Sequence, residues 1–245
     1  MKILSVPVTQ ATGLPPDQKV PFDPRDSDPY YNDMVRGLRA KVEHRVDMAG
    51  IRALGVTSAV AGEGKTKTSL QLAINMASTG RKKVLLMDLD LRKSDLAKEM
   101  RIPAVPGLGE YLSGSVSSEK IIRITSIRGL YLVPGGKPHQ SPVDMIAGEK
   151  IRLFLKGLRE HFDLLILDAP PILPVSDAIT ISDQLDAFIM VFRLGFTPYK
   201  MLQQAVDELG MEKILGVVLN GEEKKSDKYY SRYYGSYYKS SYTEK

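Results

Sequence analysis

The feature that most constrains the fold of this chain is a glycine-containing run at residues 59–66, AVAGEGKT. It follows a short apolar stretch at 51–57 and precedes a segment at 66–79 with helical periodicity. A strand, this loop and a helix, in that order, form a P-loop, with Ala59 in place of the usual first glycine. The alternative is a glycine-rich turn with a chance lysine, which does not require that order. The order favours a nucleotide triphosphate site.

The residue types of this loop suit the chemistry of phosphates. Gly62 and Gly64 let backbone N–H groups turn inward, and the helix that follows directs its positive N-terminal end at a bound anion. Lys65 is expected to reach the β- and γ-phosphates, and the Thr66 hydroxyl is expected to ligate magnesium.

Apolar strands and helices alternate through the centre of the chain. Such alternation predicts a single α/β domain with a mostly parallel, doubly wound sheet covered on both faces. The first helix is predicted at 30–46, with Met34, Leu38, Val42 and Val46 at helical spacing. Strands are predicted at 51–57, 83–87, 130–133, 164–167, 187–192 and 214–219, and further helices at 66–79, 147–160, 177–184 and 198–209.

The two ends of the chain differ from this core. Residues 1–29 hold six prolines and predict an extended N-terminal arm, which leaves 30–221 as the P-loop domain. Residues 222–245 lack aliphatic residues and predict a disordered, low-complexity tail. This tail carries Tyr229, Tyr230, Tyr233, Tyr234, Tyr237, Tyr238 and Tyr242.

Acidic residues follow two of the predicted strands. Asp88 and Asp90 come after the strand at 83–87, and Asp168 follows the strand at 164–167. Ligands of parallel sheets bind at the carboxyl ends of the strands, and a buried carboxylate there needs a positive partner such as a phosphate-bound magnesium ion. The alternative is that these acids are helix caps or turn residues.

Composition narrows the remaining classes. The chain has no cysteine, which excludes a disulfide framework and a thiolate metal site. The net charge of +5 indicates either an acidic partner or basic residues spread around a nucleotide enzyme. No apolar run approaches the roughly 20 residues of a membrane span, and the start lacks a signal-peptide pattern. We therefore expect a cytoplasmic protein that a partner recruits to the inner face of the membrane.

Together these motifs resemble the cytoplasmic domain of bacterial tyrosine kinases, the BY-kinases of polysaccharide synthesis and export, which are related to the MinD and ParA ATPases. The family's P-loop matches 62–66, its second Walker motif, Asp-x-Asp-Leu-Arg, matches 88–92, and its Walker B element, Asp-x-Pro-Pro, matches 168–171 with Asp177 downstream. A family motif, Glu-x-x-Arg-x-x-Arg, occurs here as Asp33, Arg36 and Arg39.

The resemblance implies an ATP-dependent autokinase that phosphorylates the tail tyrosines in trans and regulates exopolysaccharide or capsule synthesis. It implies catalysis by Lys65, Asp88, Asp90 and Asp168, with Asp88 orienting or deprotonating the acceptor tyrosine. Thr66, Asp88 and Asp168 would hold magnesium, and Asp33, Arg36 and Arg39 would contact neighbouring subunits. The residues expected to bind the nucleotide are Ala61, Gly62, Glu63, Gly64, Lys65, Thr66, Lys67 and, near the base, Asn220.

The implied partners are further copies of the chain in a ring, a transmembrane activator or polysaccharide co-polymerase, and a phosphotyrosine phosphatase, with no nucleic acid. One alternative function is a MinD- or ParA-like ATPase switch that binds partners or DNA. That group has a signature lysine where this chain has Val60. The other is a nucleotide-bound scaffold without catalysis. For the tail, the alternatives are an inert terminus or a strip that stacks on nucleic-acid bases between its basic residues.

Overall fold

The computed structural model describes residues 29–139 and 141–221. The predicted tail and its seven tyrosines, and the predicted arm apart from its last residue, lie outside the described residues.

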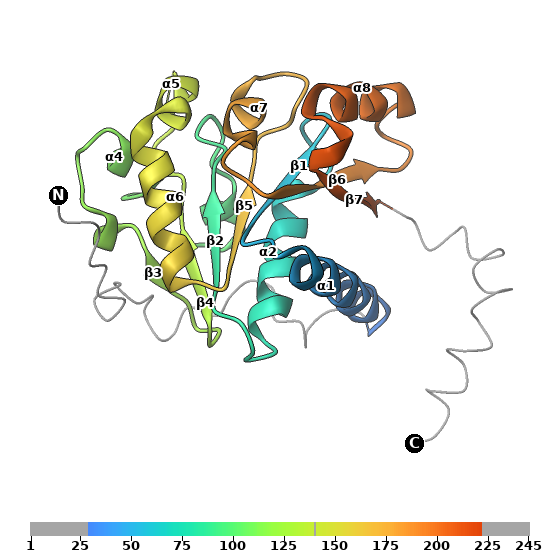
Figure 1. Ribbon diagram of the computed structural model, residues 1–245, viewed down its shortest axis with the longest axis horizontal. Coiled ribbons are helices and arrows are strands. Elements are labelled where there is room, and N and C mark those ends of the chain that lie inside the picture. The colour runs from blue at the N-terminus through green and yellow to red at the C-terminus, as the bar shows by residue number, and fades with distance from the viewer. Residues whose placement is uncertain (1–28, 140, 222–245) are drawn as a thin grey trace, which may run out of the picture.

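The described part of the chain forms one seven-stranded sheet with the strand order β3-β4-β2-β5-β1-β6-β7 (Figure 1). All neighbouring strands are parallel except β3, which runs antiparallel to β4 at the edge. This confirms the predicted fold class. The strands are β1 Ala53–Ser58, β2 Val84–Asp88, β3 Arg123–Ile124, β4 Leu130–Val133, β5 Leu164–Asp168, β6 Ala187–Arg193 and β7 Ile214–Asn220.

Helices lie on both faces of this sheet. They are α1 Pro29–Ala49, α2 Lys65–Ala77, α3 Leu96–Glu99, α4 Leu108–Leu112, α5 Pro142–Ala147, α6 Glu149–His161, α7 Asp177–Ser182 and α8 Tyr199–Leu209, with 3-10 turns at Ser118–Lys120 and Met211–Lys213. The predicted helix at 147–160 is wrong in its start, because Gly148 is extended (φ −72°, ψ 157°) and separates α5 from α6. The short elements β3, α3, α4 and α5 were not predicted.

The strands are buried on both sides, which explains their continuous apolar sequences. One face of β1, β2 and β5 presents Leu54, Val56, Leu86 and Ile166 to a core that includes α2 and residues of α1. The other face presents Leu85, Met87, Leu165 and Leu167 to a core that includes α6, α7 and α8. Figure 1 shows α1 and α2 together on one side and α6 to α8 away from them. Two cores therefore hold the central strands rigidly, and with them the loops at the strand ends.

Helix α1 packs through a stripe that differs by one residue from the predicted one. Val35 is buried, whereas Met34 is 38% exposed. On the same helix, Arg39 forms an ion pair of 2.7 Å with the buried Glu43. Arg81, in the turn after α2, lies 3.4 Å from the same carboxylate. Part of the charged pattern of α1 thus ties the helix to its own domain.

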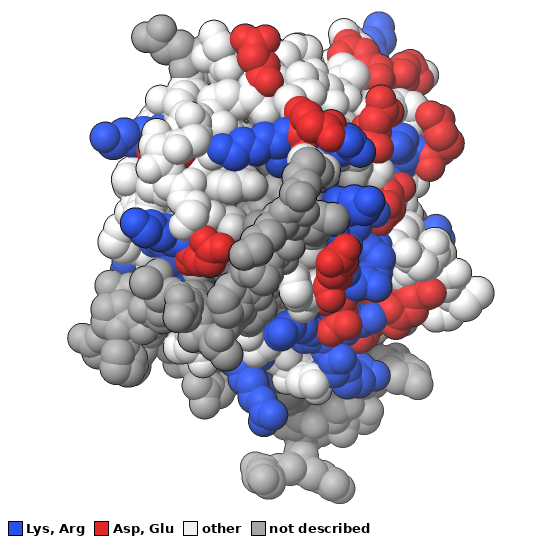
Figure 2. Space-filling view, turned by 60° about the vertical axis from the view of Figure 1, so that its left-hand side comes forward, with Lys and Arg blue, Asp and Glu red and all other residues white. Residues whose placement is uncertain are grey.

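The surface charges are mixed on the face that Figure 2 shows, where Lys and Arg side chains lie beside Asp and Glu. Arg152 and Glu149 of α6, for example, form an exposed ion pair. This face favours the reading in which the basic residues are spread over the surface. No helix within the described ranges is long and apolar enough to cross a membrane.

The contact between β1 and β6 generates a stability prediction. A Cβ atom at Gly55 would lie 2.4 Å from the Phe188 ring, so Gly55→Ala should lower the free energy of unfolding by about 1–3 kcal/mol through overpacking. Urea denaturation measures the change. Gly216→Ala is the matched control, because a Cβ at this position of β7 meets no atom within 4 Å. Equal stability of the two variants would contradict the described packing of Phe188.

Candidate nucleotide and phosphoryl-transfer site

The loop between β1 and α2 has the backbone shape of a P-loop. Gly64 precedes α2 with a φ of 95°, and Gly62 has a φ of 88°, so both lie in the left-handed region that glycine tolerates. A Cβ at Gly64 would lie 2.2 Å from Nδ2 of Asn220. The sequence therefore needs glycine at this position both for the turn and for the close approach of β7.

Three side chains attach this loop to the ends of β6 and β7. Glu63 is fully buried, and its carboxylate accepts hydrogen bonds from the backbone N–H of Val60 (2.8 Å) and of Arg193 (3.2 Å). Arg193 Nη1 donates to the carbonyl of Gly62 at 3.1 Å, and Asn220 Nδ2 donates to the carbonyl of Glu63 at 2.7 Å. Glu63, predicted to bind the nucleotide, is placed here as a support of the loop.

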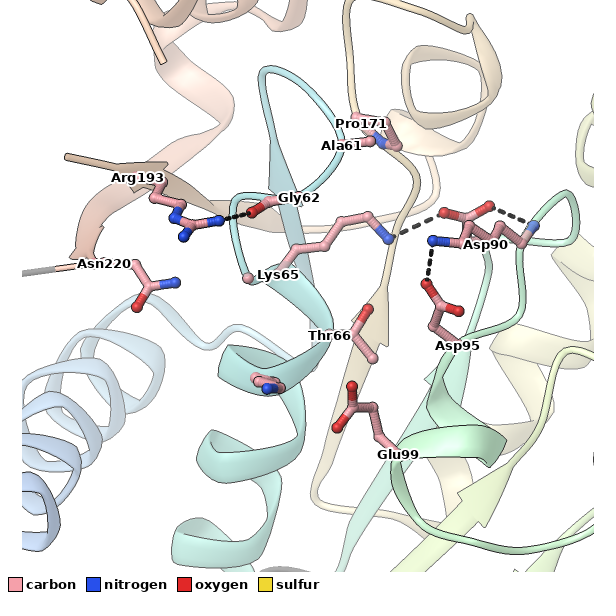
Figure 3. A pocket seen from close by; sticks show the side chains of 14 residues that line it. Ala61, Gly62, Lys65, Thr66, Asp90, Asp95, Glu99, Pro171, Arg193 and Asn220 are labelled. Carbon is pink, nitrogen blue, oxygen red and sulfur yellow. Dashed lines mark hydrogen bonds and ion pairs between the residues drawn. The ribbon is translucent and has the colours of Figure 1, made fainter. Parts of the chain in front are cut away.

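A cavity of about 450 Å³ lies over the loop, within the size range of small-molecule sites. Figure 3 shows Lys65 extending across it from α2 towards Asp90, with Arg193 and Asn220 on the opposite side of the loop. The lining residues are Ala61, Gly62, Gly64, Lys65, Thr66, Lys67, Asp90, Lys93, Asp95, Glu99, Pro171, Arg193, Asn220 and Gly221. The P-loop and the segment after β2 thus face each other across this cavity.

The central contact of the site is the ion pair between Lys65 and Asp90. Lys65 Nζ lies 3.0 Å from Asp90 Oδ2, and the two side chains are only 11% and 9% exposed. The other Asp90 oxygen accepts a hydrogen bond of 3.0 Å from the backbone N–H of Lys93. Asp90 is the carboxylate of the three predicted acids that lines the cavity.

Asp88 and Asp168 lie side by side below the cavity, as partners in the register of β2 and β5. Asp88 is fully buried, and its oxygens accept hydrogen bonds from the Asp90 backbone N–H (3.0 Å), the Ser94 hydroxyl (2.7 Å) and the Leu96 N–H (3.3 Å). Asp168 is 1% exposed, and neither of its carboxylate oxygens accepts a hydrogen bond of ordinary geometry, although the Thr66 and Ser69 hydroxyls lie near it. Parallel pairing therefore brings two buried acids together, one of them unsatisfied.

The pKa values reflect this burial of negative charge. Burial, followed by the neighbouring charge of Asp168, raises the pKa of Asp88 well above its usual range. Burial also raises the pKa of Asp168, although the positive charge of Lys65 and the nearby Thr66 and Ser69 hydroxyls act in the opposite direction. For Lys65, burial would lower the pKa, but the charges of the three aspartates outweigh it and the pKa is raised. The lysine is thus held in its charged form.

The environment of the Asp168 carboxylate tests whether a metal ion fits this site. A buried carboxylate without hydrogen bonds is costly unless positive charge arrives, and Mg²⁺ prefers oxygen ligands. Thr66, at the second position of α2, and Asp168 and Asp88 would hold the ion. Within the described ranges, no group of three or more His, Cys, Asp or Glu side chains is arranged to bind a metal. Magnesium at nucleotide sites usually takes phosphate oxygens as further ligands, so the nucleotide would complete the site.

The other predicted residues are placed as follows. Ala61, Lys67 and Asn220 line the cavity. Asp33 and Arg36 form an exposed pair of 3.5 Å on α1. The cavity also takes in Arg193, Pro171, Asp95 and Glu99, which sequence reasoning did not assign to the site. Their one sequence signal is that they follow buried strands, and the strand order is needed to bring those strand ends together.

Comparisons with known proteins agree with this geometry. Residues 52–193 match the family model described as AAA domain. The tyrosine-protein kinase ptk of Acinetobacter johnsonii is 30% identical over 84% of this chain, but this chain spans only 28% of that protein's length. The tyrosine-protein kinase CpsD of Streptococcus pneumoniae serotype 4 is 32% identical over 84% of this chain and 88% of the relative.

Solved structures give the same result. The kinase domain of the Escherichia coli tyrosine kinase ETK is 30% identical, with a TM-score of 0.72 over 76% of this chain and 74% of that one. The septum site-determining protein MinD of Pyrococcus horikoshii shares the fold, with 21% identity and a TM-score of 0.57 over 69% of this chain and 68% of that one. The fold and site are those of a nucleotide-binding P-loop protein. The chain belongs to the family of bacterial tyrosine-protein kinases, and its enzyme class is protein-tyrosine kinase.

The unsatisfied Asp168 generates a prediction about stability and pH. Because burial raises its pKa, ionisation of Asp168 destabilises the metal-free protein. This cost is absent below about pH 4, where the carboxyl group is protonated in both folded and unfolded chains, and it grows as the pH rises towards the raised pKa. Asp168→Asn should therefore stabilise the protein in EDTA at pH 7 by about 1–2 kcal/mol, and by less near pH 4.

Chemical denaturation at the two pH values measures this effect. Asp207→Asn on the exposed face of α8 is the control and should change little. A loss of stability in Asp168→Asn at pH 7 would show that the carboxylate is satisfied in the metal-free protein.

Proposed function

We propose that this chain transfers the γ-phosphoryl group of ATP to tyrosine hydroxyls in the C-terminal tail of a neighbouring copy. The observation that carries the proposal is the cavity in which Lys65 and Asp90 face each other above the unsatisfied carboxylate of Asp168. A P-loop with acids on the opposite wall suits phosphoryl transfer, which depends mostly on positioning and charge neutralisation.

The residues of the site divide the work. Magnesium, held by Thr66, Asp88 and Asp168, would neutralise phosphate charge. Lys65 leaves Asp90 to bind the β- and γ-phosphates, which frees the Asp90 carboxylate. A tyrosine hydroxyl, with an ordinary pKa near 10, needs a base at neutral pH. We assign that role to Asp90, because Asp90 lines the cavity, whereas Asp88 is buried and engaged by Ser94.

The step then balances as follows. The tyrosine oxygen forms a bond to the γ-phosphorus while its proton passes to Asp90. The bond between that phosphorus and the bridging oxygen of ADP breaks, and ADP leaves. This assignment moves the role of proton acceptor from Asp88, where the resemblance puts it, to the neighbouring Asp90. Asp88 keeps its proposed role beside the metal.

The tail is the proposed acceptor because its seven tyrosines follow β7, whose last residue lines the cavity. A tail that enters a neighbour's site favours a closed ring of copies, since heterologous contacts that close make rings. The relatives of this chain include kinases of capsule regions, such as the putative tyrosine-protein kinase in the cps region of Klebsiella pneumoniae. By this likeness we propose a role in exopolysaccharide or capsule synthesis, at the inner face of the membrane. A transmembrane activator or co-polymerase would recruit the chain, and a phosphotyrosine phosphatase would reverse the reaction.

The competing proposal is an ATPase switch of the MinD type that acts without modifying protein. Val60 stands where that group has its signature lysine, and the switch gives the tyrosine tail no role. These features favour the kinase.

The first functional prediction concerns Lys65 and Asp90. Lys65→Met and Asp90→Asn should each lower tail phosphorylation at least about 100-fold, because one loses a phosphate contact and the other its proposed base. Phosphotyrosine on the purified chain, counted by mass spectrometry, is the measurement. Lys156→Met, an exposed lysine on α6, is the control. Undiminished phosphotyrosine in Lys65→Met would refute the mechanism, and undiminished phosphotyrosine in Asp90→Asn alone would return the role of base to Asp88.

The second functional prediction concerns assembly, and it separates the two arginines of α1. Arg36 is 68% exposed in its weak pair with Asp33, so Arg36→Ala should reduce the oligomer mass in sedimentation without changing the unfolding midpoint. Arg39→Ala should lower the midpoint, because the buried Glu43 loses its nearest partner. An unchanged oligomer in Arg36→Ala would refute the proposed use of this motif.

A further inference from the structure

Arg92, two residues after Asp90, forms a second ion pair, and this pair joins the two segments that carry the acids of the site. Arg92 Nε donates to Asp177 Oδ2 at 2.9 Å, and Arg92 Nη2 donates to Asp177 Oδ1 at 3.2 Å. Asp177 is the first residue of α7 and its side chain is 1% exposed, whereas Arg92 is 38% exposed. Two parallel hydrogen bonds between a guanidinium and a carboxylate fix direction as well as distance.

The loop that carries Asp90 is packed into the core through the buried Leu89 and Leu91, and few polar contacts tie it to other elements. It has no regular structure between β2 and α3, and the Lys93–Asp95 pair lies within it and is largely exposed. Backbone bonds connect Leu89 to the carbonyl of Asp168 and His139 to the carbonyl of Leu91. Among the ion pairs of the described residues, only Lys65–Asp90 and Arg92–Asp177 tie this loop to other elements.

In the proposed reaction, the Lys65–Asp90 ion pair breaks while the Arg92–Asp177 ion pair stays formed. When Lys65 turns to the phosphates, Asp90 loses its partner across the cavity. Of the two ion pairs, Arg92–Asp177 then remains, and it adds a directional contact to the segment that runs from Asp168 at the end of β5 to α7. Figure 1 shows α7 at the end of the sheet where β2 and β5 finish. The pair is therefore placed to keep Asp90 at a fixed position relative to Asp168.

We propose that Arg92 and Asp177 are positioning residues that hold Asp90 in place for phosphoryl transfer once Lys65 has released it. The inference rests on the proposed function, because it assumes that the reaction uses Asp90. It acts through geometry, so it requires the fork of arginine. Lysine at position 92 keeps the charge but cannot form both bonds to Asp177.

The test compares Arg92→Lys in two backgrounds. In the wild-type background we expect Arg92→Lys to lower kcat for tail phosphorylation about 10-fold to 100-fold, with the KM for ATP changed less than about 3-fold. In the Asp90→Asn background, Arg92→Lys should change the residual rate less than about 2-fold, because the group that it positions is already lost. Asp177→Asn should behave in the same way. Arg152→Lys is the matched control, because Arg152 makes a similar forked pair with Glu149 on the exposed face of α6.

The outcomes separate this inference from the proposed function. Absence of phosphotyrosine in the wild-type chain contradicts the proposed function, and the same comparison is then made on the rate of phosphate release from ATP. An equal fractional loss of rate in the wild-type and Asp90→Asn backgrounds overturns the positioning role and indicates general destabilisation. Thermal unfolding of each variant identifies a folding failure, and for a variant that does not fold, Arg92→Gln combined with Asp177→Asn removes both charges together and repeats the comparison.

Discussion

Three carboxylates, those of Asp88, Asp90 and Asp168, meet one ammonium group at the carboxyl edge of the sheet. Buried negative charge of this kind is costly, and in the described structure Lys65 is the side chain that compensates it. Parallel strands that end together place these acids next to the first turn of α2. A metal ion bound with a nucleotide at this position would supply the positive charge that offsets the cost. The two hydrophobic cores hold β1, β2 and β5 in place largely without these charges. The proposed phosphoryl transfer, in contrast, depends on the three carboxylates and Lys65.

The same constraint explains why the P-loop is anchored so firmly. The lysine can exchange between Asp90 and a phosphate only if the loop beneath it stays in place. Glu63, Arg193 and Asn220 provide that anchor by joining the loop to the ends of β6 and β7. Because β7 leads directly into the tyrosine-rich sequence, the loop that would bind ATP and the segment proposed to receive the phosphate are attached to the same strand end.

Local sequence patterns predict much of this fold and part of the site. Strands β1, β2, β4, β5, β6 and β7 are short apolar runs between helices, so burial on both faces identifies them. Lys65, Thr66, Gly62 and Gly64 are recognised because the phosphate chemistry sets their spacing. The antiparallel β3 has only two residues, and the break at Gly148 depends on one extended residue inside an otherwise helical pattern, so neither leaves a periodic signal.

Contacts between segments that are distant in the sequence could not be predicted from local patterns. The pairing of Arg92 with Asp177 spans 85 residues, and the contact of Glu63 with Arg193 spans 130. The burial of Asp88 beside Ser94, which leaves Asp90 as the one of the three predicted acids that lines the cavity, follows from the path of one loop and not from residue type. These are matters of three-dimensional register, and they decide which of several equivalent acids faces the substrate.

The most direct test of the account is a crystal structure of the chain with Mg²⁺ and a non-hydrolysable ATP analogue. The account predicts that Lys65 Nζ lies within about 3 Å of a β- or γ-phosphate oxygen and more than about 4 Å from both oxygens of Asp90, with the metal next to Asp168. A structure in which Lys65 remains paired with Asp90 while the phosphates are bound by other groups would contradict it.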